Sequence, residues 1–163
     1  MKKGFTLIEL LIVVLVIAVL MAIAVPMYMM TIEKGKATEI VKLTRNIYDA
    51  AERYAFRNNG ATPDVFKYLD IELRGTIPDN NQRQFINDFG NFTLSETEIK
   101  GARNNPPASI GGYYFLIPRS GADEGVMFCC AQSDANALKI CAGLSSTTTE
   151  ATGCTGGYTG YRM

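Results

Sequence analysis

Apolar residues are concentrated at the start of the chain. Residues 5–32 include 24 apolar side chains among 28, and no charged residue occurs from Leu10 to Ile32. As a helix, those 23 residues would be roughly 35 Å long, which exceeds the roughly 30 Å apolar core of a bilayer. The pattern therefore predicts a membrane-spanning helix over residues 5–32.

The helical pattern continues beyond this stretch but becomes amphipathic. Apolar side chains recur at steps of three or four residues, at Ile40, Leu43, Ile47, Ala50, Ala51 and Tyr54. The sequence Asn58-Asn59-Gly60, followed by Pro63, is a strong stop signal for a helix. We therefore expect one helix from Phe5 to about Asn58, gently bent at Pro26.

The remainder, residues 33–163, is predicted to form a small globular domain. Segments 91–96, 113–118 and 126–131 are alternating or densely apolar, which predicts strands. An antiparallel meander of three or four strands, packed on the amphipathic half of the long helix, would bury the apolar faces of both. The fold class is therefore α+β, with the hydrophobic half of the helix protruding from the domain.

Two segments are predicted to connect the long helix to the strands. Thr62-Pro63-Asp64 has the residues of an N-cap, a first-position proline and a first-turn acid, which predicts a short helix to about Asp70. Residues 75–91 are rich in Asn, Asp, Gln and Gly, which is typical of loop.

Four cysteines lie near the C-terminal end, at Cys129, Cys130, Cys141 and Cys154. An even number after an export segment predicts two disulfides formed in an oxidising compartment, with free buried thiols as the alternative. A bond between adjacent cysteines is strained, so either Cys129–Cys141 occurs with Cys130–Cys154, or Cys130–Cys141 occurs with Cys129–Cys154. A short helix capped by Ser133-Asp134 and reaching Leu144 would bring Cys141 back toward the strand that holds Cys130. We therefore favour the second pairing, which tethers the C-terminal loop.

Composition argues against several classes of function. The chain has no His, which removes Ser–His and Cys–His nucleophile pairs and imidazole-based metal or haem sites. Its 16 basic and 16 acidic residues give no net charge, so nucleic-acid binding is not expected. The adjacent cysteines do not match a zinc knuckle, and Asp123, Glu124 and Asp134 do not form a DxDxDG calcium loop. We therefore expect no catalysis, no metal and no cofactor.

The N-terminal residues allow two general interpretations. Lys2 and Lys3, with Ala22-Ile23-Ala24 as a small-residue cleavage site, would fit a cleavable secretory signal. Alternatively, the segment is an ordinary membrane anchor whose basic end stays in the cytoplasm. Neither interpretation gives a role to Glu9, although a carboxylate costs about 2.5–3.5 kcal/mol at the bilayer centre and less near its boundary.

A third interpretation uses Glu9. Met1 to Leu11 resembles the class III signal of type IV pilins and pseudopilins, with a short basic leader ending in Gly4, then Phe5-Thr6-Leu7-Ile8-Glu9, then a long apolar helix. The resemblance implies that prepilin peptidase removes residues 1–4 by cutting between Gly4 and Phe5 and N-methylates Phe5. The new amine and Glu9 lie one helical turn apart, so the carboxylate offsets a cation in low dielectric, in the same chain or its neighbour.

The family also suggests roles for other positions. In pilus fibres, the residue equivalent to Glu9 is thought to draw each incoming subunit into register against the N-terminus of the previous one. Pro26 falls where the family commonly has a helix-bending proline. Pilins often fasten a variable C-terminal loop to the sheet by a disulfide, whereas the major pseudopilins of type II secretion lack such bridges and use calcium in this region.

The resemblance implies a structural subunit of a type IV pilus-like filament, serving adhesion, motility or DNA uptake. Its implied partners are copies of itself, prepilin peptidase, the inner-membrane assembly platform with its ATPase, and minor pilins. The chain would lie in the bacterial inner membrane with a cytoplasmic N-terminus, and then in a surface pilus or a periplasmic pseudopilus. The alternatives are a pseudopilin of a type II secretion or competence system, and a membrane-anchored periplasmic binding domain or hydrolase.

Overall fold

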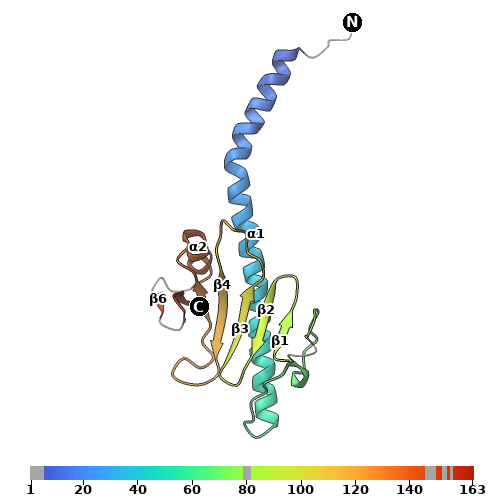
Figure 1. Cartoon of the computed structure of the whole chain (residues 1–163), viewed down its shortest axis with the longest axis vertical. Coiled ribbons are helices and arrows are strands. Elements are labelled where there is room, and N and C mark those ends of the chain that lie inside the picture. The colour runs from blue at the N-terminus through green and yellow to red at the C-terminus, as the bar shows by residue number, and fades with distance from the viewer. Residues whose placement is uncertain (1–5, 79–81, 146–149, 152–153, 155) are drawn as a thin grey trace. The chain divides into compact units, whose positions relative to one another are not determined.

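The computed structural model describes residues 6–78, 82–145, 150–151, 154 and 156–163 (Figure 1). The chain divides into two compact units, Met1–Lys34 and Gly35–Met163. One helix, α1 (Leu7–Arg57), contributes to both units. This confirms the expectation of a single long N-terminal helix, although α1 begins two residues later than expected.

The end of α1 follows the predicted stop signal. Asn59 and Gly60 both adopt positive φ angles, 55° and 85°, in the left-handed region that favours Asn and Gly. The Gly60 N–H then donates to the Ala55 carbonyl at 2.8 Å, which satisfies one of the last helical carbonyls.

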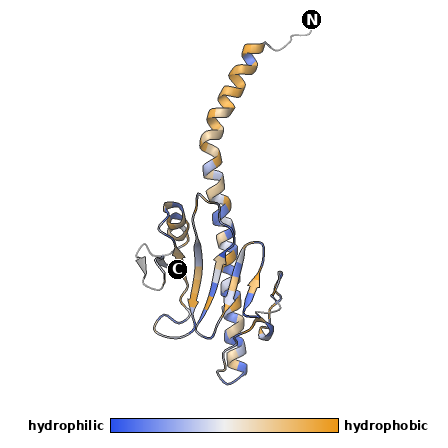
Figure 2. Cartoon of the chain, in the orientation of Figure 1, coloured by the Kyte–Doolittle hydropathy of each residue, from blue (hydrophilic) through white to orange (hydrophobic). Residues whose placement is uncertain are grey.

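The first unit contains the most apolar part of the helix. From Leu7 to Met29 every side chain is exposed, and the most apolar 18-residue window of α1 has a mean hydropathy of 3.2 with no part buried. In Figure 2 most of the ribbon in this part of α1 has the orange colour of hydrophobic residues. By length and composition, the helix is able to cross a membrane.

The second unit is built on one antiparallel sheet. Among the described residues, seven strands have the order β1-β2-β3-β4-β5-β7-β6. Their bounds are β1 Gln84–Ile86, β2 Gly90–Leu94, β3 Glu98–Arg103, β4 Tyr113–Pro118, β5 Phe128–Ala131, β6 Glu150–Ala151 and β7 Thr159–Arg162. Strands β1 to β5 form a meander, and β7 then pairs with β5 on one side and β6 on the other. The α+β class is therefore confirmed, with a larger sheet than the predicted three or four strands.

One face of the sheet packs against residues 35–57 of α1. The helix buries one stripe, formed by Ala37, Ile40, Thr44, Ile47, Ala50 and Ala51. Gly101 in β3 allows close approach, because a Cβ there would collide with the Thr44 hydroxyl and lie 2.9 Å from Ile40 Cγ2. The Thr44 hydroxyl is itself satisfied, since it donates to the Ile40 carbonyl at 2.8 Å.

The predicted helix near Asp70 is wrong in extent. The structure has only a single 3-10 turn, Phe66–Tyr68, with Val65 at its N-cap and no side-chain capping bond. Asp64 instead pairs with Arg83 at 2.7 Å, and the Pro63 carbonyl accepts a bond from Arg119 Nη1 at 3.0 Å. The Asp64 carboxylate and the Pro63 carbonyl are therefore bonded to residues distant in sequence and do not start a helix.

The predicted loop at 75–91 is also partly wrong. It contains all of β1, the first residues of β2, and a bridge between Thr76 and Ile86. The prediction for segment 113–118 is confirmed as β4, and segment 126–131 contains β5. Asp134 caps α2 (Ala135–Leu144) as expected, because its carboxylate accepts from the N–H groups of Asn136 and Ala137.

Candidate functional site

The N-terminal motif is the first candidate site. The predicted cleavage position, Gly4 and Phe5, lies outside the described residues. The described chain starts at Thr6, whose N–H and hydroxyl both donate to Glu9 Oε2 at 2.8 Å. The Glu9 N–H donates back to Thr6 Oγ1 at 3.3 Å. Thr6 and Glu9 therefore form a reciprocal capping box at the start of α1.

This capping box gives Glu9 a partner that the sequence analysis missed. The sequence pattern predicts only a terminal amine as the partner of the carboxylate. The signal was present, because Thr or Ser followed three residues later by Glu is the usual pattern of a capping box. Both bonds from Thr6 reach the same oxygen, and within the described part of the chain Glu9 Oε1 accepts no hydrogen bond.

Pro26 lies inside α1, which continues through it without a break. Proline has no N–H, so the carbonyl of Ala22 loses its helical hydrogen bond. The bend expected at this position stays a prediction.

The second candidate site is the cystine-bounded C-terminal region. All four cysteines form disulfides, so the prediction of two bridges is confirmed and the free-thiol alternative is wrong. The bridges are Cys129–Cys141, with a Cα–Cα distance of 5.4 Å, and Cys130–Cys154, at 5.7 Å. The favoured pairing of Cys130–Cys141 with Cys129–Cys154 is therefore wrong.

The reason for the error lies in the alternation of side chains along β5. Cys129 pairs across the ladder with Phe115, which in turn pairs with Gly101, and this row faces α1. Helix α2 contributes Cys141 on the same side of the sheet. Cys130 points to the opposite face, where Cys154 lies. Sequence alone does not tell which face of the sheet a following helix covers.

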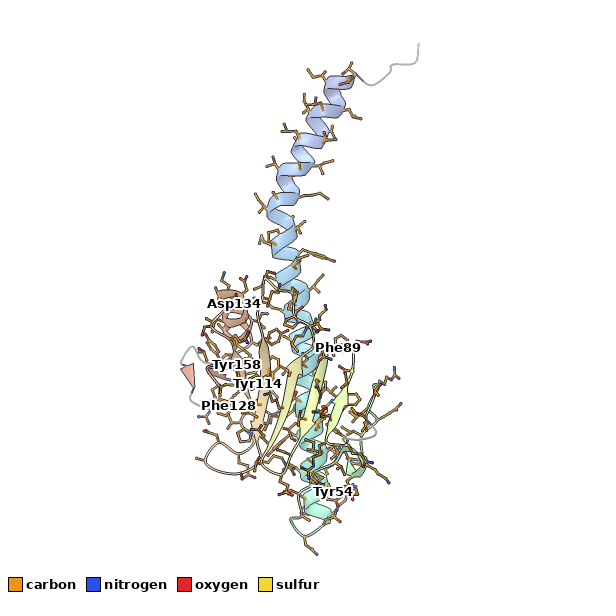
Figure 3. The ribbon with its side chains drawn as sticks, in the orientation of Figure 1. Tyr54, Phe89, Tyr114, Phe128, Asp134 and Tyr158 are labelled. Atoms are coloured by element: carbon orange, nitrogen blue, oxygen red, sulfur yellow. A yellow bond between two sulfur atoms is a disulfide. The ribbon has the colours of Figure 1, made fainter. Side chains whose placement is uncertain are left out.

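The bridge to Cys154 belongs to a second, smaller core on that opposite face (Figure 3). Its buried members are Tyr114, Leu116, Phe128 and Cys130, and its partly buried members include Cys154 and Tyr158. The rings of Tyr114 and Tyr158 meet edge to face, with centroids 4.9 Å apart. The C-terminal residues are therefore held to the sheet by a bridge and by aromatic packing.

Polar side chains of the second unit have mainly structural partners. Arg119 is buried, and its Nη1 donates to the carbonyls of Pro63 and Ser95 at 3.0 and 2.9 Å. Burial lowers the pKa of this guanidinium, and Glu52 at 3.9 Å partly opposes that effect. Through these two bonds from Nη1, Arg119 joins the segment after α1, at Pro63, to the β2–β3 turn, at Ser95.

Two of the three acidic residues considered for calcium have other partners. Asp134 caps α2, and Asp123 lies 3.7 Å from Arg162 Nη2. Across the described ranges, no cluster of three or more Cys, Asp or Glu side chains is arranged to hold a metal. The polar side chains described in this section therefore take part in backbone capping and ion pairs, and the cysteines form bridges.

Comparison with known proteins gives one informative result. No curated protein and no solved structure matches the chain. Residues 1–25 match the family described as a prokaryotic N-terminal methylation motif. The chain therefore carries the methylation motif that is the class III signal of type IV pilins, and its long apolar helix begins within the matched residues.

Proposed function

We propose that the chain is a structural subunit of a type IV pilus-like filament, without catalytic activity of its own. The observation that carries this proposal is the combination of the methylation motif at residues 1–25 with an apolar helix whose side chains are all exposed from Leu7 to Met29. A cleavable secretory signal would have no use for a methylation motif. A plain anchor would likewise have no use for a methylation motif.

The physical argument concerns what can cover this helix. Burying a Val, Leu, Ile, Phe or Met side chain is worth about 1.5–3 kcal/mol relative to exposure, so this row of exposed apolar side chains strongly favours an apolar environment. Lipid provides that environment before assembly. The apolar helices of other copies of the chain provide it in a filament.

We infer the surrounding steps from the same motif. Prepilin peptidase removes residues 1–4, the N-terminus stays on the cytoplasmic side of the inner membrane, and the chain is then extracted by an assembly platform with its ATPase. Minor pilins start or regulate the filament. The subunit itself associates with other copies and forms the surface of the filament. The assembly platform and its ATPase supply the energy for its extraction from the membrane.

Mass spectrometry of the mature protein tests the first step. We expect a chain that begins with N-methylated Phe5 and retains both disulfides. A chain that begins at Val25 would show instead that the helix is a cleaved secretory signal and would contradict the proposal.

Substitution of Glu9 tests assembly. We expect Glu9→Ala to be processed normally and to accumulate in the membrane instead of in filaments, because the carboxylate is needed to bind an incoming amine. Glu39→Ala is a matched control, since Glu39 is an exposed acid on the same helix that pairs with Lys42 at 2.9 Å. Wild-type yields of filament from Glu9→Ala would contradict the role proposed for Glu9.

A pseudopilin remains the second candidate, because pilins and pseudopilins share this motif. The two bridges in the C-terminal region favour the pilus, since the resemblance associates such bridges with pilins. Electron microscopy of sheared surface material, with an antibody against this chain, separates the candidates. Long labelled surface fibres support a pilus subunit, and label confined to the periplasm supports a pseudopilin.

A further inference from the structure

We propose that Thr6 is a positioning residue for assembly, which holds the Glu9 carboxylate on its own helix and presents the second carboxylate oxygen to the amine of another copy. This inference rests on the proposed function. It adds that the neighbouring subunit recognises Thr6 and Glu9 as a unit, and that Glu9 alone is insufficient.

The geometry assigns different tasks to the two carboxylate oxygens. Glu9 Oε2 accepts from both the N–H and the hydroxyl of Thr6, each at 2.8 Å. Because the Glu9 N–H returns a bond to Thr6 Oγ1 at 3.3 Å, the Thr6 side chain is fixed as well. Glu9 Oε1 has no partner in the described residues, so one oxygen of an oriented carboxylate can accept a further hydrogen bond.

This arrangement has a consequence for the subunit before assembly. An ionised carboxylate without hydrogen bonds is strongly destabilised in an apolar environment. Thr6 supplies two donors from within the chain, so the carboxylate is partly satisfied while the subunit waits in the membrane. It also restricts the rotamers of Glu9, which reduces the entropy lost when a second copy binds.

Two threonines within α1, Thr31 and Thr44, make a different kind of hydrogen bond. Thr31 donates its hydroxyl to the Met27 carbonyl at 3.0 Å, and Thr44 donates to the Ile40 carbonyl at 2.8 Å. These are ordinary bonds to the preceding helical turn. Only Thr6, among these three, bonds a carboxylate, so Thr31 offers a reference for the loss of a hydroxyl from the same apolar segment.

The test measures how well each variant enters filaments made by the wild-type chain. Thr6→Val, Thr6→Ser and Thr31→Val are each co-expressed with wild type. Mass spectrometry then gives the variant's share of the processed membrane pool and of the sheared filaments. Normalising to processed chain separates assembly from leader removal, and wild-type subunits keep filaments present even when a variant assembles poorly.

We expect Thr6→Val to be depleted from filaments about tenfold relative to Thr31→Val, because bonds to a charged group are the strong ones. Thr6→Ser keeps the hydroxyl and should enter filaments within about twofold of wild type. In a Glu9→Gln chain, Thr6→Val should add less than about a twofold further depletion, because Thr6 acts through the carboxylate.

Two results would overturn the inference. One is equal incorporation of Thr6→Val and Thr31→Val. The other is an undiminished effect of Thr6→Val in the Glu9→Gln chain, which would show that Thr6 does not act through Glu9. If the wild-type chain enters no filament at all, the proposed function itself fails and this inference fails with it, which distinguishes the two failures.

Discussion

The two parts of α1 share one backbone conformation and differ in what surrounds their side chains. In residues 7–29 apolar side chains occupy all sides of the helix and are exposed. In residues 37–51 they form one stripe that is buried under the sheet. The difference shows that helix formation is common to both patterns, whereas the width of the apolar surface determines the environment that each part requires.

The largest expected effect compares two isoleucines of this helix. Ile47 is 0% exposed and Ile17 is 47% exposed. We expect Ile47→Ala to lower the free energy of unfolding of the second unit by about 2–5 kcal/mol, because it leaves a cavity. Ile17→Ala should change it by less than about 0.5 kcal/mol. Urea unfolding of both full-length variants in detergent, followed by near-ultraviolet circular dichroism, measures the difference, and equal losses would contradict the comparison.

The next effect concerns the two bridges, which lie on opposite faces of β5. Replacing either cystine by two alanines should lower the free energy of unfolding by about 3 kcal/mol. Their accessibility should differ, because Cys129 and Cys141 are fully buried and Cys154 is only partly buried. We therefore expect a mild dithiol to open Cys130–Cys154 first. Alkylation and peptide mapping at partial reduction would show this, and earlier labelling of Cys141 would contradict it.

A smaller effect distinguishes two glycines of the second unit. A Cβ on Gly101 would collide with Thr44, whereas a Cβ on Gly35 would meet nothing within 4 Å. Gly101→Ala should therefore destabilise the second unit by about 1–3 kcal/mol. Gly35→Ala should instead stabilise the helix by up to about 1 kcal/mol, because alanine is the better helix former. Thermal unfolding of both variants checks the opposite signs.

The smallest effect is a pH dependence of the second unit. Hydrogen bonds from Arg53, with a further contribution from Arg57, hold the pKa of Asp70 below its usual value. The pair therefore stabilises the fold fully above the ordinary carboxyl pKa, and this contribution is lost as pH falls through the lowered value. Asp70→Asn should lower the urea midpoint slightly at neutral pH and not at about pH 2. An exposed aspartate without an ion pair in the described chain, Asp88, provides the control Asp88→Asn.

Long local signals made much of the fold predictable. The apolar pattern and the Asn58-Asn59-Gly60 stop signal gave α1 nearly to its ends, and Asp134 gave the start of α2. Strand β4 was predictable because Tyr113–Pro118 is densely apolar. Each of these elements carries its own signal in consecutive residues, so no knowledge of distant partners was needed.

The missed elements depend on partners far away in sequence. Strand β3 contains Glu98, Lys100 and Gly101, and it is a strand because β2 and β4 pair with both of its edges. Strand β7 is four residues long and is fixed by β5, from which it is separated by α2. The prediction of the cystine pairing was wrong for the same reason, since the pairing depends on which face of the sheet α2 covers. The capping box, in contrast, was predictable from the sequence, because Thr6 and Glu9 are only three residues apart.

The adjacent cysteines of β5 have a consequence for folding fidelity. A slip of β5 by one residue against its neighbours would exchange the faces of Cys129 and Cys130. Neither sulfur could then reach its present partner, because Cys141 and Cys154 lie on opposite sides of the sheet. A slip of β5 by one residue would therefore prevent oxidation in the present pairing. The two bridges form together only when β5 has not slipped in this way, and once formed they fix its present register covalently.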